Sequence, residues 1–151
     1  IAAKLKKFGL TIAEHRLLDD VTEHTKAAIE ELLDLGMDII LCTGGMSVDP
    51  DDQTPLAIKN TGARIVSYGA PVLPGAMFLL SYYDAGDRLV PICGLPGCAM
   101  YNKRTIFDIV LPRLMACDMI LADELAGLGE GGLCLNCDVC TFPNCGFGKG
   151  F

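Results

Sequence analysis

Two stretches of this chain have residue types and spacing that suit ligand chemistry, and the first follows a short apolar run. Residues 44–53, G-G-M-S-V-D-P-D-D-Q, combine paired glycines with a serine and several aspartates. Glycines let backbone amides approach a ligand closely, Ser47 can bond an oxygen of the ligand, and Asp52 can hold Mg²⁺ against a phosphate. Asp49 could instead cap a helix that starts at once, but Pro55 would interrupt that helix. We therefore predict a true loop, followed by a helix capped by Thr54.

The second stretch, C-G-L-P-G-C at residues 93–98, also leads from an expected strand into an expected helix. Gly94 and Gly97 permit close backbone approach, and the amides after Gly97 would form an anion site at the helix N-terminus. The same field predicts a lowered pKa for the Cys98 thiol. The simpler interpretation is that Cys98 only caps and packs.

Four of the eight cysteines crowd near the C-terminal end, at Cys134, Cys137, Cys140 and Cys145. Their spacing, C-x2-C-x2-C-x4-C, begins like the run that binds a [4Fe-4S] cluster in bacterial ferredoxins. A Zn²⁺ site also uses four thiolates, but its two pairs are usually farther apart, and a flexible, oxidisable tail is the third interpretation. The other cysteines lie among apolar residues, which is typical of small buried side chains in a reducing cytoplasm.

The elements that must position these residues alternate between strand and helix patterns. Strands are expected at 10–18, 38–43, 63–68, 76–83 and 88–93, and helices at 19–36, 55–61 and 98–117. Residues 76–83 and 88–93 are expected to form a hairpin, and Pro91 predicts that its second strand lies at an edge or is bulged. We predict an α/β three-layer sandwich with a mostly parallel sheet and helices on both faces. Residues 1–118 would form this domain, and residues 119–151 a Gly-rich joint with a short Cys-rich extension.

Composition narrows the classes of partner. The net charge of -7 argues against nucleic acid. No apolar run reaches the roughly 18 residues that a membrane span needs, so we expect no membrane partner and a cytoplasmic location. The chain opens without Met on what reads as the end of a helix, so we interpret it as a fragment of a longer protein.

Three motifs together resemble the molybdopterin-binding domain of molybdenum-cofactor biosynthesis proteins. T-G-G-M-S-V-D-P-D-D-Q-T-P is similar to that family's G-G-x-S-x-G-x-x-D loop, G-L-P-G-C followed by I-F-D-I-V-L-P-R-L to its L-P-G-N-P loop and last helix, and A-P-V-L-P-G-A-M-F to its K-P-G-K-P segment. The resemblance covers residues 1–116. It implies a three-layer α/β fold, a homodimer or homotrimer, and a pterin or nucleotide ligand. It also implies that the chain binds molybdopterin and adenylates it with Mg-ATP or inserts molybdate into the adenylated form.

The resemblance also implies a set of site residues. Asp52 would be catalytic and handle Mg²⁺, and the ligand would be bound by Thr43, Gly44, Gly45, Ser47, Pro74, Gly75, Leu95, Pro96, Gly97 and Cys98. Several positions depart from the family pattern: Asp49 replaces a Gly, Leu73 and Ala76 replace basic residues, and Cys98 replaces an Asn. A non-catalytic molybdopterin-binding or redox-sensing module therefore stays open as an alternative. A nucleotide pyrophosphatase-like domain, as in competence-damage-inducible proteins, is a further one.

Overall fold

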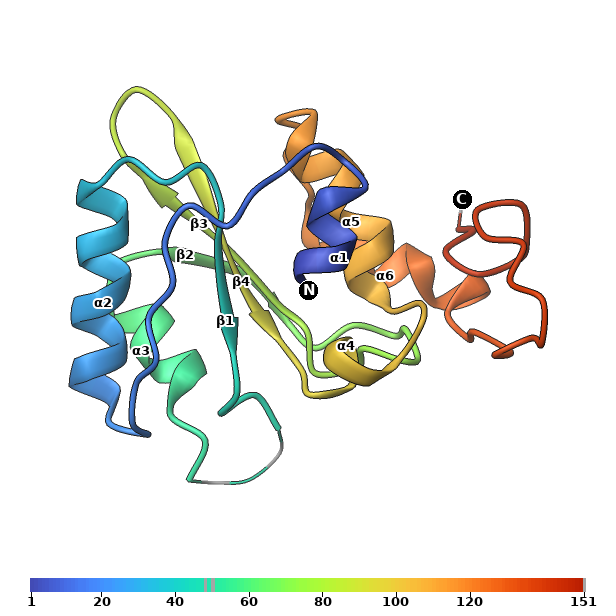
Figure 1. Cartoon of the computed structure of the whole chain (residues 1–151), viewed down its shortest axis with the longest axis horizontal. Coiled ribbons are helices and arrows are strands. Elements are labelled where there is room, and N and C mark those ends of the chain that lie inside the picture. The colour runs from blue at the N-terminus through green and yellow to red at the C-terminus, as the bar shows by residue number, and fades with distance from the viewer. Residues whose placement is uncertain (48, 50, 151) are drawn as a thin grey trace.

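A four-stranded sheet with helices on both faces forms the body of the protein (Figure 1). The structure is a computed structural model that describes residues 1–47, 49 and 51–150. The strands are β1 (Ile40–Thr43), β2 (Arg64–Tyr68), β3 (Leu79–Asp84) and β4 (Leu89–Leu95), in the order β1-β4-β3-β2. The helices are α1 (Ala2–Lys6), α2 (Thr22–Asp34), α3 (Thr54–Asn60), α4 (Cys98–Tyr101), α5 (Ile106–Met115), α6 (Ala122–Gly127) and the 3-10 helix η1 (Leu128–Gly131).

The sheet is mixed and mostly antiparallel, so the prediction of a mostly parallel sheet is wrong. β3 pairs antiparallel with both β2 and β4, and only β1 and β4 pair in parallel. The reason is the short connection between β3 and β4, which can only join antiparallel neighbours. Two antiparallel pairings separate β2 from β4, so β2 still runs in the same direction as β1 and β4. The carboxyl ends of these strands therefore reach one edge of the sheet.

Pro91 does not place β4 at an edge of the sheet, which was one of the two predicted possibilities. β4 lies between β1 and β3. Pro91 faces Tyr82 of β3, whereas the pairing with β1 begins only at Ile92, opposite Ile40. The shortness of β1 explains the result, because the proline lies just before the stretch that pairs with β1.

Alternate strand residues face two separate cores, which makes the protein a three-layer sandwich. Leu80 of β3 belongs to a core shared with Phe107 of α5. Its neighbour Leu79 belongs to the opposite core, shared with Ile29 of α2 and Ile58 of α3. This alternation is the period of a strand buried on both faces. Helices on both faces were predicted, and the structure has them.

Two predicted elements differ from the structure. Residues 10–18 form no strand but an extended segment between α1 and α2, in which Leu17 is 92% exposed. The helix expected over 98–117 is two helices, since the backbone leaves the helical region at Asn102 and α5 starts afresh. A capping box between Thr105 and Asp108 fixes that new start.

The C-terminal part packs on the same core as α5. Ile120 and Leu125 are each 1% exposed, and Phe147 is 5% exposed within that core. The boundary at residue 118 stays a prediction. Among the helices of residues 1–47, 49 and 51–150, none combines the length and apolar character required to cross a membrane.

Candidate functional site

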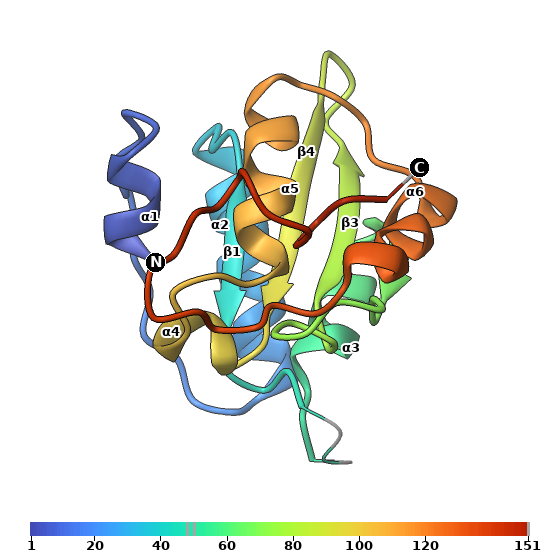
Figure 2. The same cartoon turned by 90° about the vertical axis from the view of Figure 1, so that its right-hand side faces the viewer.

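Three loops leave the same edge of the sheet and form the candidate site. Thr43 and Leu95, the last residues of β1 and β4, are paired in register. β2 ends at Tyr68, and its direction brings the loop 69–78 to the same edge. The loop after β1, the loop after β2 and helix α4 all lie at the lower end of the sheet in Figure 1 and again in Figure 2. We call this region the sheet edge.

Hydrogen bonds hold the loop after β1 in a defined shape. The Ser47 N–H and the Ser47 hydroxyl both donate to Asp52 Oδ2, at 2.5 and 2.6 Å. The Thr54 hydroxyl donates to the carbonyl oxygen of Gly44 at 3.0 Å. α3 begins at Thr54, one residue before the predicted start, so Thr54 is not the cap. Gln53 takes the N-cap position without a side-chain cap hydrogen bond, and the Thr54 hydroxyl closes the loop instead.

The same loop is anchored to the sheet through Met46. This side chain is only 3% exposed and packs directly over Gly94 of β4. A Cβ atom at Gly94 would lie 2.4 Å from the Met46 methyl carbon, so only glycine leaves room for it. Gly94 was predicted to give a ligand access, whereas here it gives access to a neighbouring side chain.

An open cleft of about 460 Å³ lies beside this loop. Its lining mixes polar and apolar side chains, namely Ser47, Asp49, Asp52, Gln53, Pro55, Leu56, Tyr68 and Met77. Sites for small organic ligands combine the same two kinds of side chain.

Tyr68 is a cleft residue that sequence reasoning missed. Its hydroxyl donates to the Ser47 carbonyl oxygen at 3.0 Å and so ties β2 to the loop after β1. Partial burial, and after it the Asp52 carboxylate, raise the pKa of the Tyr68 hydroxyl. The signal was available, because Tyr68 ends an expected strand, and ligands gather beyond such ends.

Of the predicted site residues, only Ser47 and Asp52 line the cleft, and the others have varied surroundings. The Ile106 N–H at the start of α5 donates to the Pro74 carbonyl oxygen at 3.1 Å, so this turn docks on the helix. Leu95 is 1% exposed and belongs to the core. Gly97 is exposed at the surface, and a Cβ atom there would meet nothing within 4 Å.

The predicted reactive thiol at Cys98 is contradicted. Desolvation is the largest influence on this group and raises its pKa, with smaller opposing contributions from backbone hydrogen bonds and Lys4. α4 spans only Cys98–Tyr101, so few peptide dipoles align behind its N-terminus. The simpler interpretation, a packed cysteine at a helix start, describes this residue better.

The cysteines outside the C-terminal group were predicted to be buried, and only some of them are. Burial raises the pKa of the Cys42 thiol to about 12 and also raises that of Cys93. Both match the expectation of small buried side chains. Cys117 is instead exposed, at the end of α5.

The predicted metal ligands are not gathered around a single point. Across residues 1–47, 49 and 51–150, no three His, Cys, Asp or Glu side chains lie close enough together to hold one metal ion. The structure therefore supports neither a preformed tetrahedral Zn²⁺ site nor an all-protein Mg²⁺ cage. Mg²⁺ does not require such a cage, because it commonly uses one or two carboxylates together with ligand phosphates.

Comparison with known proteins points to one family. A family model described as a probable molybdopterin binding domain matches residues 1–116. The molybdopterin molybdenumtransferase of Synechococcus elongatus is 25% identical over 114 residues, which are 76% of this chain and 28% of the relative. The chain thus spans less than a third of that relative's length. The C-terminal cysteines lie beyond the stretch that the family model matches.

Proposed function

Since the chain belongs to the molybdopterin-binding domain family of molybdenum-cofactor biosynthesis, we propose that its sheet edge is the surface that binds molybdopterin. The observation that carries the proposal is the register of Thr43 with Leu95, which brings the loops after β1 and β4 side by side. In α/β sheets, ligands bind beyond the carboxyl ends of the strands. Family and relative together support a role in molybdenum-cofactor biosynthesis.

The cleft walls suggest how such a ligand is held. Molybdopterin combines a flat ring system with a phosphate group. The apolar side chains Leu56 and Met77 of the cleft suit the ring, whereas the amides of Gly44 and Gly45, earlier in the same loop, suit the phosphate. Glycine amides and hydroxyls are the usual phosphate donors in loops that follow strands.

Asp52 is the residue that we propose to hold Mg²⁺ against the ligand. The acidic loop would repel an anionic ligand unless a cation lay between them. Among the described residues, both bonds to the Asp52 side chain end on Oδ2. Oδ1 is therefore the oxygen that we assign to the cation, with the ligand's phosphate completing its coordination.

We further propose that molybdate insertion into adenylated molybdopterin is the reaction served by this site. The name of the matched relative, a molybdopterin molybdenumtransferase, supports this choice over adenylyl transfer. The non-catalytic binding module and the nucleotide pyrophosphatase remain the alternatives, and a dimer or trimer stays a prediction. Release of AMP from adenylated molybdopterin on addition of molybdate distinguishes the transferase from both.

Gly97→Val tests the binding surface without disturbing the fold. Open space surrounds the position and its φ of -53° suits any residue, so the unfolding midpoint should stay unchanged. Molybdopterin affinity should fall at least about tenfold, because the branched side chain holds the ligand away from the backbone. The measurement is an anaerobic binding titration of both proteins.

The titration is informative only if the Gly97→Val protein is shown to be folded. Unaltered affinity in a folded Gly97→Val protein would show that the ligand does not approach the loop after β4. Gly146→Val is a matched control, because that glycine also has open space around it but lies in the C-terminal segment, outside the matched region. It should leave molybdopterin affinity unchanged.

A further inference from the structure

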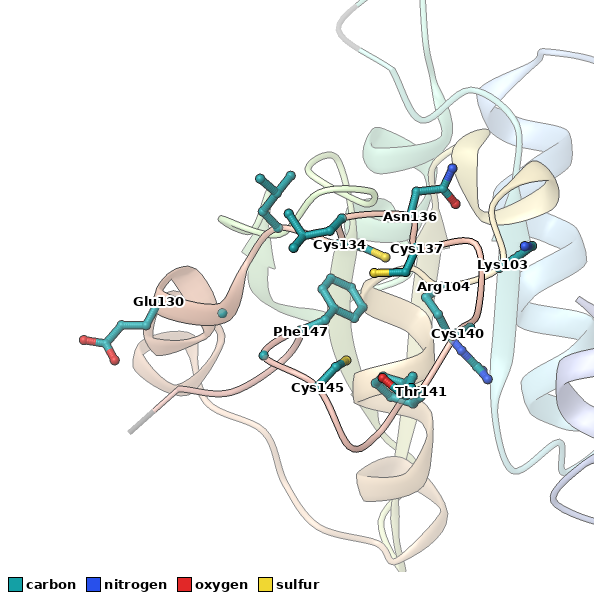
Figure 3. Close-up of a pocket in the computed structure, with 15 residues that line it drawn as sticks. Lys103, Arg104, Glu130, Cys134, Asn136, Cys137, Cys140, Thr141, Cys145 and Phe147 are labelled. Carbon is teal, nitrogen blue, oxygen red and sulfur yellow. The ribbon is translucent and has the colours of Figure 1, made fainter.

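The four C-terminal cysteines border one cavity, although they come from different turns of the chain. The cavity has a volume of about 240 Å³. Its walls include Cys134, Cys137, Cys140 and Cys145, the rings of Phe142 and Phe147, and the basic residues Lys103 and Arg104. Figure 3 shows the Cys134 and Cys137 side chains pointing toward the interior, whereas Glu130 points away. We call this space the cysteine cavity.

The segment that carries these cysteines is held against the domain by backbone bonds. The Cys134 N–H donates to the Leu73 carbonyl oxygen at 2.8 Å, and the Leu73 N–H donates to the Gly132 carbonyl oxygen at 2.5 Å. The core includes Phe147, and Cys134 and Cys145 pack against it. These contacts distinguish the segment from the flexible tail that was one interpretation of the sequence.

A fixed positive charge forms part of the cavity wall. Arg104 donates to Asp108 at 3.1 Å, and its guanidinium lies 4.7 Å from the centre of the Phe142 ring. Asp108 also accepts a hydrogen bond from Lys4, so a buried carboxylate holds the arginine in place. A guanidinium in this position favours anionic sulfur in the cavity.

The spacing of the thiols favours a cluster over a single ion. A tetrahedral zinc site needs every sulfur about 2.3 Å from one point, yet no three ligand side chains of the described residues converge in that way. In an iron–sulfur cluster each thiolate binds a different iron atom, so the sulfurs stand around a wider volume. Four thiols that border one cavity of about 240 Å³ leave room for the second arrangement.

We propose that the cysteine cavity binds a [4Fe-4S] cluster, ligated by Cys134, Cys137, Cys140 and Cys145. On binding, the thiols lose their protons and each thiolate forms one bond to iron. The negative charge of the ligated cluster is offset by Arg104 and Lys103. This site is separate from the sheet edge proposed for molybdopterin, and neither proposal depends on the other.

The test is cluster content after anaerobic purification and reconstitution with ferrous iron and sulfide. We expect about four iron and four sulfide per chain, with the absorption and Mössbauer spectra of a [4Fe-4S] cluster. The paired variant Cys137→Ser/Cys140→Ser should lose the cluster, and it should keep molybdopterin affinity. Cys117→Ser is the matched control, because this exposed cysteine lies outside the cavity lining and should leave cluster content unchanged.

A second test measures how the positive charge of Arg104 affects the reduction potential of the cluster. Arg104→Gln should lower the reduction potential of the cluster, because a positive neighbour stabilises the reduced, more negative form. Arg104→Lys keeps the charge and should restore much of the potential. One zinc ion per chain without sulfide, no bound metal, or equal loss of cluster in Cys117→Ser would each overturn the proposal. If the wild-type protein carries the cluster but does not bind molybdopterin, only the proposed function is overturned.

Discussion

Asp52→Asn is expected to reduce molybdate-dependent release of AMP from adenylated molybdopterin about a hundredfold, the scale on which loss of one preorganised electrostatic contact lowers turnover. Asparagine has nearly the same shape, and its side-chain oxygen can still accept from Ser47, which donates to Asp52 Oδ2. The loop should keep its form and lose only the charge that holds Mg²⁺. The measurement is single-turnover AMP release in the protein that carries this chain.

Asp51→Asn is the control for this substitution. It removes the same charge from the same loop, at an exposed residue outside the cleft lining. It should retain AMP release within a few fold. If Asp52→Asn releases AMP as fast as the wild type, with the same dependence on Mg²⁺, then Asp52 serves only to shape the loop.

Gly75→Ala is expected to destabilise the domain by about 3 kcal/mol, through backbone strain and overpacking together. Gly75 has a φ of 128°, which side chains rarely adopt, and an added Cβ would lie 2.5 Å from Ile106 Cγ2. Relief of that contact requires the turn to move off the N-terminus of α5. Chemical unfolding of the purified variant measures the effect.

Gly86→Ala separates strain from crowding. This glycine in the β3–β4 turn has a φ of 91°, but a Cβ there would meet nothing within 4 Å. We expect a cost of about 1 kcal/mol from the backbone alone. Equal destabilisation by the two variants would mean that the contact between Gly75 and α5 contributes nothing measurable.

The edge of the sheet at which we propose the site could be predicted from the sequence, even though the direction of the strands in the sheet was predicted wrongly. The rule that ligands gather at strand carboxyl ends depends on strand direction, and β1, β2 and β4 do share one direction. The hairpin of β3 with β4 was expected, but the position of β3 between β4 and β2, antiparallel to both, was not. A local hydrophobic pattern does not distinguish these arrangements, because it sets burial and not partners.

The other differences between prediction and structure were not equally readable in the sequence. The break before α5 was readable in T-I-F-D, the Thr105 to Asp108 spacing of a capping box. The role of Gly94 could not be read from the sequence. Its neighbour Met46 lies far along the chain and contacts it only because β1 pairs with β4. Long-range contacts of this kind need the fold before they can be named.

The resistance of Cys98 to the predicted activation has a similar cause. A helix over 98–117 was expected, but the break at Asn102 leaves a single turn, Cys98–Tyr101. Burial outweighs the backbone hydrogen bonds and Lys4, and raises the pKa of the Cys98 thiol. The predicted direction was wrong because burial, which depends on the fold, was left out.

The central claim is that molybdopterin binds at the sheet edge, and backbone amide shifts measured by NMR during an anaerobic titration test it most directly. We predict that the largest shifts fall on Gly44, Gly45, Ser47 and Gly97, at the ends of β1 and β4. The amides of Cys137 and Cys140, in the cysteine cavity, should move little. Saturable shifts confined to the cysteine cavity, with the four loop amides unmoved, would contradict the account.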